Sequence, residues 1–293
     1  MILPRFSGQV VKVKVTVLQT NWFSVFHMGN FLSQQHFTRH HIFLLTFLVF
    51  VVCGVSRSQT WDWINPKPQG NPLRGVYFIN QETGFSVGDV GTIMKTIDGG
   101  VTWDVKICLT SSDLLDIQFP IKGNVVYAVG TGGTILKTTD IGETCSFQQS
   151  NIGAALFAVH FPVNNQLGYA AGTGVILKTN DGGTTWNQTP SPQYWYNDIW
   201  FVGNDTGWAV GYGGVLVKTV DGGNTWVLNN NTFGGDDYFD VKFPFNTTTG
   251  FISGGSDLAQ FIFPLLKSTD GGETWNIVDN PARTVLHSMN FPS

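Results

Sequence analysis

The 293-residue sequence is long enough for one large all-β domain or two ordinary ones. Charged residues make up 12% of it and the formal net charge is -4, which argues against a nucleic-acid partner, because phosphate neutralisation needs clustered Lys and Arg. Three cysteines are too few for a disulfide-built scaffold, and none is spaced as a metal ligand. We therefore expect no nucleic-acid partner, no metal site and no cofactor.

The first 58 residues differ from the rest of the chain. Residues 42–53 read IFLLTFLVFVVC, an apolar run shorter than the about 20 residues that span a membrane but typical of a signal-peptide core. Ser56 and Ser58 then supply the small residues of a cleavage site after Ser58. We expect residues 1–27 to be untranslated or a disordered leader, with the true start at Met28. Residues 28–58 are then a signal peptide that directs export (secreted, periplasmic or lumenal), and the chain meets a membrane only through this segment.

One motif recurs five times in the remaining chain. Its copies read KTIDGGVTW, KTTDIGETC, KTNDGGTTW, KTVDGGNTW and KSTDGGETW, and their aspartates stand 40 to 49 residues apart. Each copy follows an alternating segment that ends in Phe, a small-residue segment that ends in Gly, and a third apolar segment. Four short antiparallel strands in about 40–45 residues are typical of a propeller blade. We predict an all-β fold, a β-propeller of four-stranded antiparallel blades over residues 59–293.

The two ends of this region look like parts of a further blade. Thr60-Trp61 stands before Phe78 as Trp226 stands before Phe243, which indicates an orphan fourth strand. Phe291 in turn ends an opening strand. We expect five complete repeats plus these partial strands, an incomplete ring and a truncated product.

The chemistry of the repeated motif is that of a turn. An Asp carboxylate accepts backbone N–H groups just after it, Gly supplies positive φ, and the Trp buries a large ring. Because an identical carboxylate recurs once per blade, we interpret the motif aspartates as structural and not as catalytic or calcium-binding residues. The lysine that begins each copy recurs in the same way and is interpreted as structural too. The residues assigned to this structural role are Asp98, Trp103, Asp140, Asp181, Trp186, Asp221, Trp226, Asp270 and Trp275.

The pattern S/T-x-D-x-G-x-T-W resembles the Asp-box, or bacterial neuraminidase repeat. The span Gln59–Ser293 resembles the photosystem II stability and assembly factor family, through the runs Gly207–Gly211, Gly214–Thr219 and Asp221–Trp226. The resemblance implies a non-catalytic, lumenal or exported propeller that binds a protein partner during assembly of a membrane complex.

Asp-boxes also occur in sialidases, xyloglucan-active glycosidases and sortilin-type receptors, so a carbohydrate-binding or glycoside-hydrolase propeller acting on extracellular glycans is the alternative. A sialidase needs an arginine cluster, and after the signal segment only Arg74 and Arg283 remain. A glycosidase needs two facing carboxylates. Asp116, Asp198 and Asp240 each precede the strand that ends in Phe, near the mouth of a central channel if that strand is innermost. Their repeated placement favours a loop-capping role, and we expect no enzyme.

Ligands of propellers bind to the loops of one face, because loops carry the variation. The variable stretches Pro192–Tyr196 and Phe233–Phe239, with the inserted loop Gly255–Phe263, predict an aromatic and acidic surface. Such a surface suits a protein partner and, as the alternative, a glycan. Each ring could instead fill a gap between blades. The candidate residues are Tyr194, Trp195, Tyr196, Tyr212, Asp236, Asp237 and Tyr238.

Two kinds of covalent modification stay open. N-x-T sequons begin at Asn187, Asn204, Asn230 and Asn246 and would be glycosylated only in a eukaryotic secretory pathway. Cys108 and Cys145 can pair only if the fold brings their Cα atoms within about 7 Å.

Overall fold

The computed structural model describes residues 69–120, 124–229, 236–244, 248–255, 265–278 and 285–291. The predicted signal segment, the orphan strand at Thr60-Trp61 and all but the first residue of the loop Gly255–Phe263 lie outside these residues. Chain contacts divide the protein into Met1–Asp62 and Trp63–Ser293, and the described residues all belong to the second unit.

The strands form five separate four-stranded antiparallel sheets, numbered here as blades 1 to 5 in chain order. This confirms the predicted β-propeller of four-stranded blades. Blade 1 contains β1 (Leu73–Phe78), β2 (Gly84–Gly88), β3 (Thr92–Thr96) and β4 (Asp104–Lys106); blade 2 contains β5 (Leu114–Gln118), β6 (Val126–Gly130), β7 (Ile135–Thr138) and β8 (Ser146–Gln148); blade 3 contains β9 (Leu156–His160), β10 (Gly168–Gly172), β11 (Val175–Thr179) and β12 (Asn187–Gln188); blade 4 contains β13 (Tyr196–Val202), β14 (Thr206–Gly211), β15 (Val215–Thr219) and β16 (Val227–Leu228); blade 5 contains β17 (Asp237–Lys242), β18 (Gly250–Gly255), β19 (Leu265–Ser268) and β20 (Asn276–Val278).

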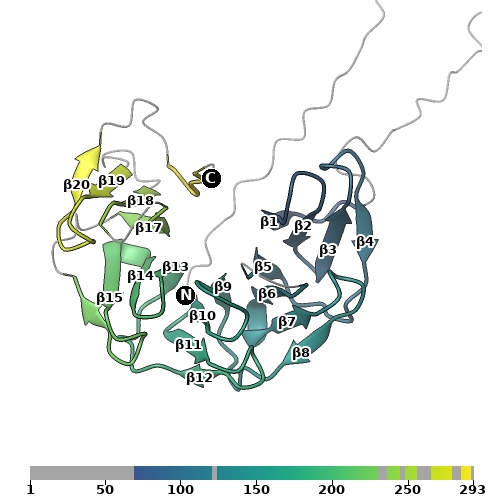
Figure 1. Cartoon of the computed structure of the whole chain (residues 1–293), viewed down its shortest axis with the longest axis horizontal. Coiled ribbons are helices and arrows are strands. Elements are labelled where there is room, and N and C mark those ends of the chain that lie inside the picture. Colours follow the sequence, from purple (N-terminus) through teal and green to yellow (C-terminus); the bar gives the residue numbers. More distant parts are fainter. Residues whose placement is uncertain are drawn as a thin grey trace, which may run out of the picture. The chain divides into compact units, whose positions relative to one another are not determined.

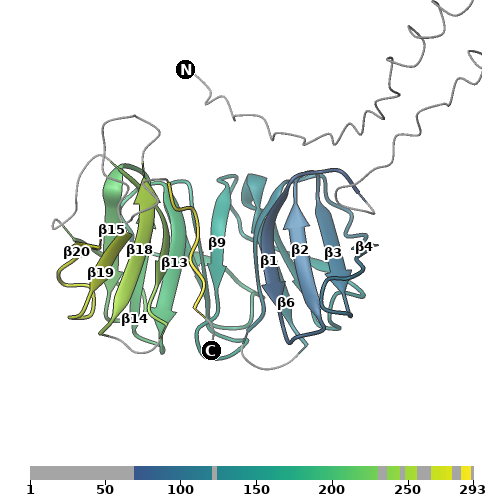
Figure 2. The same ribbon diagram turned by 90° about the horizontal axis from the view of Figure 1, so that it is seen from above.

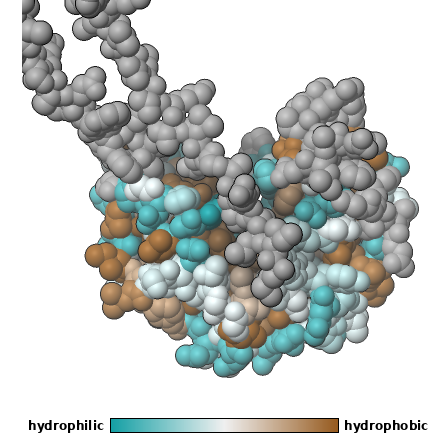
Figure 3. Space-filling model, turned by 180° about the vertical axis from the view of Figure 1, so that it is seen from behind, coloured by the Kyte–Doolittle hydropathy of each residue, from teal (hydrophilic) through white to brown (hydrophobic). Residues whose placement is uncertain are grey.

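The first strand of each blade lies innermost. Strands β1, β5, β9, β13 and β17 contact one another in sequence, so the blades follow an arc (Figure 1). Two short 3-10 turns, η2 (Thr131–Gly133) and η3 (Tyr212–Gly214), link second to third strands at the same end of the sheets (Figure 2). The surface in Figure 3 shows hydrophobic residues in separate patches between hydrophilic ones, so no single large apolar patch marks a ligand surface on this face.

Each repeated motif forms a turn held by its own side chains. In blade 4, Asp221 accepts the Thr225 backbone N–H at 2.8 Å and the Thr225 hydroxyl at 2.6 Å. The Thr219 hydroxyl donates to Asp221 and accepts the Gly223 N–H at 2.9 Å. Gly222 and Gly223 have φ of 68° and 80°, a conformation that favours glycine. The hydrogen bonds from Thr225 lower the pKa of Asp221 to about 2. The carboxylate is therefore bound into the turn.

Aromatic rings fill the space between blades. Phe201, at the inner end of blade 4, stacks on Tyr169 of blade 3 at 3.7 Å and meets Trp226 of its own blade edge-on at 5.8 Å. The same three-ring arrangement recurs around Phe161 and Phe243. Trp186, Trp226 and Trp275 are buried, so the motif Trp of blades 3, 4 and 5 fills the contact with the preceding blade.

The motif lysines reach from one blade to the turn of the next. Lys137 donates to the Gly182 carbonyl at 2.7 Å, and Lys95 donates to Ile141 and Glu143, each at 2.7 Å. The ring of lysines therefore ties blades together in the described part of the chain.

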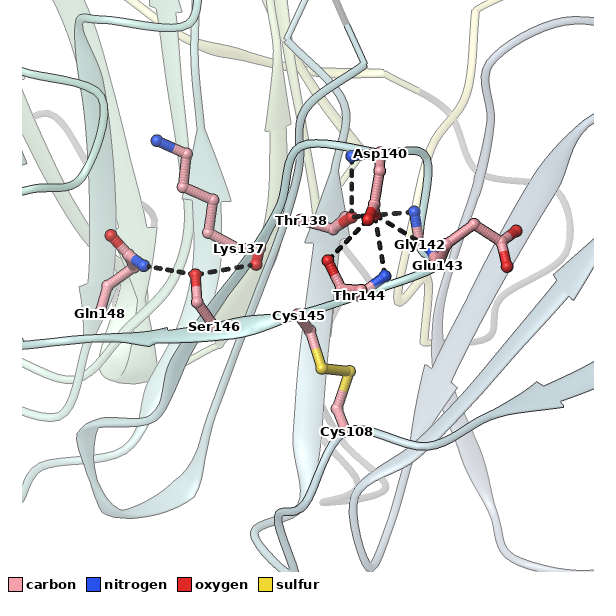
Figure 4. The surroundings of a disulfide bond; sticks show 10 residues. All are labelled: Cys108, Lys137, Thr138, Asp140, Gly142, Glu143, Thr144, Cys145, Ser146 and Gln148. Atoms are coloured by element: carbon pink, nitrogen blue, oxygen red, sulfur yellow. Dashed lines mark hydrogen bonds between the residues drawn. A yellow bond between two sulfur atoms is a disulfide. The ribbon is translucent and has the colours of Figure 1, made fainter.

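A disulfide joins blades 1 and 2. Cys145 stands where the other four motifs have Trp, and it is bonded to Cys108 with a Cα–Cα distance of 5.9 Å (Figure 4). A small cavity of about 30 Å³, lined by Phe85, Ile117 and both cysteines among others, adjoins the bond. In blade 2 a disulfide to blade 1 therefore stands at the position where the other motifs have a Trp ring.

The segment 285–291 lies against blade 5. Leu286 donates its N–H to Gly254, Met289 donates its N–H to Asp240 at 2.6 Å, and Phe291 lies 5.0 Å from the Phe251 ring. The Met289 contact matches those that β9 and β17 make with Asp116 and Asp198 of the blade before them.

Candidate functional site

One end of the sheets carries the turns between second and third strands and the segments that enter the innermost strands; we call it the loop face. Its geometry repeats from blade to blade. The first residue of the turn donates its N–H to the residue just before the innermost strand, as in Thr131 to Asp113 at 2.9 Å, Thr173 to Ala155 at 2.9 Å and Tyr212 to Trp195 at 3.0 Å. The side chains at these positions are therefore presented side by side.

In blade 4 both positions are aromatic. The rings of Trp195 and Tyr212 lie 5.5 Å apart in an edge-to-face contact. Trp195 is 54% exposed and Tyr212 45% exposed, with Tyr194 next to them at 38%. Large rings are usually buried, so an exposed and mutually packed pair is the mark of a binding surface.

An acidic group borders this pair. Asp237, just at the start of β17, accepts the Gly213 N–H at 2.8 Å and so fixes the turn that holds Tyr212. Burial raises the pKa of Tyr212, and the nearby Asp237 charge adds to the rise. Asp236 is 7% exposed, and its Oδ1 atom has no hydrogen-bond partner among the described residues. Burial and Asp237 raise the pKa of Asp236.

Two of the seven candidate residues support the surface from beneath. Tyr196 and Tyr238 are fully buried at the start of β13 and β17. The Tyr196 hydroxyl donates to the Pro192 carbonyl at 2.5 Å, which anchors the loop that carries Trp195. The Tyr238 carbonyl accepts the Asn197 amide at 2.8 Å. The surface that a ligand can touch therefore consists of Tyr194, Trp195, Tyr212 and Asp237, with Asp236 behind them.

The three innermost aspartates connect neighbouring blades. Asp116 accepts the Val159 N–H at 2.8 Å, Asp198 accepts the Val241 N–H at 2.9 Å, and Asp240 accepts the Met289 N–H. Each follows directly on a bulge in its strand. Burial raises the pKa of Asp116 to about 6. These carboxylates serve contacts between blades rather than the loop capping that their sequence position favoured.

A row of polar and aromatic side chains on the innermost strands escaped sequence reasoning. Lys242 lies 2.5 Å from Asp240 and 2.9 Å from Asp198, with its ammonium 4.8 Å from the Trp200 ring centre. Next along the row, His160 contacts Trp200 and the Gln118 amide. All of these except the aspartates occupy the middle position of the V/I-x-F segment, and this shared position was the available signal.

Ionisation in this row is set by burial and by Lys242. Burial opposes the charge of Lys242, but the two aspartates together raise its pKa. Burial raises the pKa of Asp198 well above its ordinary value. Burial also opposes ionisation of Asp240, but Lys242 and the hydrogen bond from the Met289 N–H together lower its pKa. The ammonium group of Lys242 therefore pairs with the ionised Asp240 and also contacts Asp198.

Within the described ranges, no three His, Cys, Asp or Glu side chains come together as ligands for a metal ion. No helix in those ranges is long and apolar enough to cross a membrane.

Comparison with known proteins gives a family match. The model of the family "Photosynthesis system II assembly factor YCF48" matches residues 54–147 and 190–284, more than half of the chain. No curated protein matches the chain.

Solved structures with similar chains include YCF48 proteins and a glycoside hydrolase. YCF48 bound to a D1 peptide is 20% identical over 72% of this chain and 82% of that chain, with a TM-score of 0.41. YCF48 from Cyanidioschyzon merolae is 18% identical over 75% and 88%, with a TM-score of 0.42. The GH74 enzyme of Niastella koreensis is 18% identical over 74% of this chain and 33% of its own length, with a TM-score of 0.55. At this identity the GH74 match shows the propeller fold alone.

Proposed function

The chain belongs to the photosynthesis system II assembly factor YCF48 family, and we propose on that basis that it is a non-catalytic propeller that binds a protein partner. Its role is that of an assembly or stability factor for a membrane complex. The observation that carries the proposal is the exposed Trp195–Tyr212 pair on the loop face. Rigid aromatic side chains of this kind dominate the energetics of protein interfaces.

The innermost carboxylates support a non-catalytic role. A glycosidase needs two carboxyl groups at least about 5 Å apart, with the sugar between them. Asp198 and Asp240 instead both contact the ammonium group of Lys242, at 2.9 and 2.5 Å. Asp116 accepts a hydrogen bond from the Val159 backbone N–H of the next blade. None of the three is placed to act on a substrate.

A glycan ligand is the second candidate, and the same exposed pair favours it. Indole and phenol rings also form the platforms on which sugar rings lie. The two functions differ in what the surface captures, so binding tests separate them.

We also propose that the protein is exported through its N-terminal segment. A disulfide persists in oxidising compartments and is rare in the reducing cytosol. The Cys108–Cys145 bond supports such a destination. N-terminal sequencing of the secreted protein should begin at or near Gln59, and recovery of the intact leader in a soluble cytosolic pool would contradict export.

Partner capture tests the proposed function. Tagged wild-type protein and a Trp195→Ala/Tyr212→Ala variant are incubated with solubilised membrane-complex subunits and, separately, with a glycan array. The control is Phe147→Ala, because Phe147 is as exposed as Trp195 (54%) but lies on the outermost strand of blade 2.

The proposal predicts a protein that both wild type and the control capture and the double variant loses. A glycan captured in the same pattern, without any protein, would favour the second candidate. Turnover of a β-glucan or sialoside that Asp198→Asn abolishes would overturn the non-catalytic role.

A further inference from the structure

The described cations lie almost entirely away from the loop face. The five motif lysines stand near the ends of the third strands, opposite the loop face, and Lys95, Lys137 and Lys218 bind the motif turn of the next blade. Of the other described cations, Lys106 pairs with Glu143 and Lys242 with the innermost aspartates. Arg74 is the one described Lys or Arg at the loop face, and Asp89 pairs with it at 2.8 Å.

At blades 4 and 5 the loop face carries carboxylates with no described Lys or Arg paired to them, whereas Arg74 lies near Asp89 and Asp113. Asp113, Asp236 and Asp237 stand at the entries to innermost strands, on the side of the molecule where η2 and η3 turn. The motif turns at the opposite end also carry carboxylates, but the motif aspartates there are bonded to the hydroxyl and N–H groups of their own turns. Within the described residues, the loop face therefore attracts cations.

The exposed rings and the carboxylates coincide at blades 4 and 5. Asp237 holds the Gly213 N–H, Gly213 follows Tyr212, and Tyr212 packs on Trp195. Beside them Asp236 keeps a buried oxygen for which the described residues provide no donor. A cation is attracted to the face of a Trp or Tyr ring, and Arg makes this contact more often than Lys. The guanidinium group also matches a carboxylate with two parallel hydrogen bonds.

We propose that the Trp195–Tyr212–Asp237 surface binds an arginine-bearing segment of a protein partner. The guanidinium group lies against the exposed rings and pairs with the carboxylate of Asp237, with the buried Asp236 carboxylate behind it. This inference rests on the proposed function and adds the chemistry of the partner: a basic segment in place of an acidic or a neutral one.

Peptide binding tests the chemistry directly. Three labelled Gly-Ser peptides with interspersed Arg, Lys or Glu are titrated with the whole protein, and fluorescence anisotropy is measured. Wild type should bind the Arg peptide more tightly than the Lys peptide and should not bind the Glu peptide. Trp195→Ala and Asp237→Asn should each weaken binding of the Arg peptide about five- to tenfold. Binding should also weaken with added salt, which screens exposed charge pairs.

Asp113→Asn is the matched control. Asp113 accepts the Val90 N–H as Asp237 accepts the Gly213 N–H, but the positions that correspond to Trp195 and Tyr212 hold no ring in blade 1. Asparagine keeps an oxygen acceptor in both variants, so both turns should persist, and equal melting temperatures check this. Trp195→Ala tests the surface without touching either turn.

Retention of Arg-peptide binding in Asp113→Asn, together with its loss in Asp237→Asn and Trp195→Ala, is the expected result. Equal effects of the two Asp variants, preference for the Glu peptide, or no binding of the Arg peptide would overturn the inference. If a protein partner is still captured through Trp195 while the Arg peptide fails to bind, only the partner's chemistry is wrong. If no partner is captured at all, the proposed function itself fails.

Discussion

Replacing His160 with glutamine should remove a large part of the acid sensitivity of the folded protein. His160 is 6% exposed on β9, where its Nε2 atom lies 3.2 Å from the Phe201 carbonyl and its Nδ1 atom lies 3.2 Å from the Gln118 amide. The carbonyl can only accept, so Nε2 carries the proton, and Nδ1 accepts from Gln118. The imidazole is neutral in this arrangement. Burial, assisted by the positive charge of Lys242, lowers its pKa to about 3.

The magnitude follows from the two protonation equilibria. The imidazole of the unfolded chain has a pKa of 6.5. As pH falls below that value, the unfolded state binds a proton that the folded state does not bind, and this favours unfolding. The stabilising contribution of neutral His160 is complete above pH 6.5 and is lost as pH falls towards 3. Each pH unit in this window removes about 1.4 kcal/mol, which gives about 2 kcal/mol between pH 7 and pH 5.

Asp116 acts in the opposite direction. Its folded pKa of about 6 lies above the unfolded value of 3.8, so the folded state gains stability as pH falls through this interval. The wild-type pH profile therefore sums the contributions of His160, Asp116 and the other shifted carboxyl groups, and only the comparison with a variant isolates the histidine. Glutamine keeps an amide donor for the Phe201 carbonyl and does not titrate.

Urea unfolding followed by tryptophan fluorescence, at about pH 7 and about pH 5, supplies the free energies for both proteins. The loss of unfolding free energy on acidification should be about 2 kcal/mol larger in wild type than in His160→Gln. An equal loss in the two proteins would refute the claim that His160 is buried and neutral.

Three further perturbations test the way in which the blades are held. Replacing Cys108 and Cys145 with serine should lower the unfolding free energy by about 4 kcal/mol, because the bond closes a loop of 37 residues, and calorimetry with and without reductant checks this. Trp226→Ala should cost about 3–5 kcal/mol in denaturant unfolding, since the buried ring leaves a cavity beside Phe201; unchanged stability would show that the ring is not a packing element. Asp221→Asn should lower the melting temperature at neutral pH, and the difference from wild type should shrink as pH falls from about 4 towards about 2, where the wild-type carboxylate is protonated; a constant difference would contradict the depressed pKa.

The blade architecture could be predicted because its signals are local. The turn around Asp221 needs a hydroxyl, a carboxylate and two glycines within a few residues, and all of them stand in the motif. The spacing of the motifs then leaves room for four short strands. The loop-face position of Trp195 and Tyr212 follows from the same register, since turns between second and third strands all lie at one end.

The roles that depend on contacts between blades could not be predicted in the same way. Asp116 reaches Val159 only because a bulge precedes it and because blade 3 stands at one particular height beside blade 2. Nothing in the local sequence encodes either condition. The bond between Cys108 and Cys145 likewise depends on the approach of two blades.

The burial of two candidate tyrosines had a usable signal. Tyr196 and Tyr238 occupy the position just before the bulge in their innermost strands, which is also the position of Leu114 and Leu156. Alignment of the repeats would have placed both rings in the core, because leucine marks that position as buried. Residue type alone does not separate these two buried tyrosines from the exposed Tyr194, whereas their position in the strand does.

Site-specific crosslinking tests most directly the claim that the loop face binds a protein. A photoreactive phenylalanine analogue replaces Tyr212 on the loop face in one protein and Asn204, exposed in the turn between β13 and β14 at the opposite end, in another. After irradiation with solubilised membrane-complex subunits, a protein adduct should form from position 212 and not from position 204. An adduct that forms only from position 204, or equally from both, would contradict the assignment of the loop face as the binding surface.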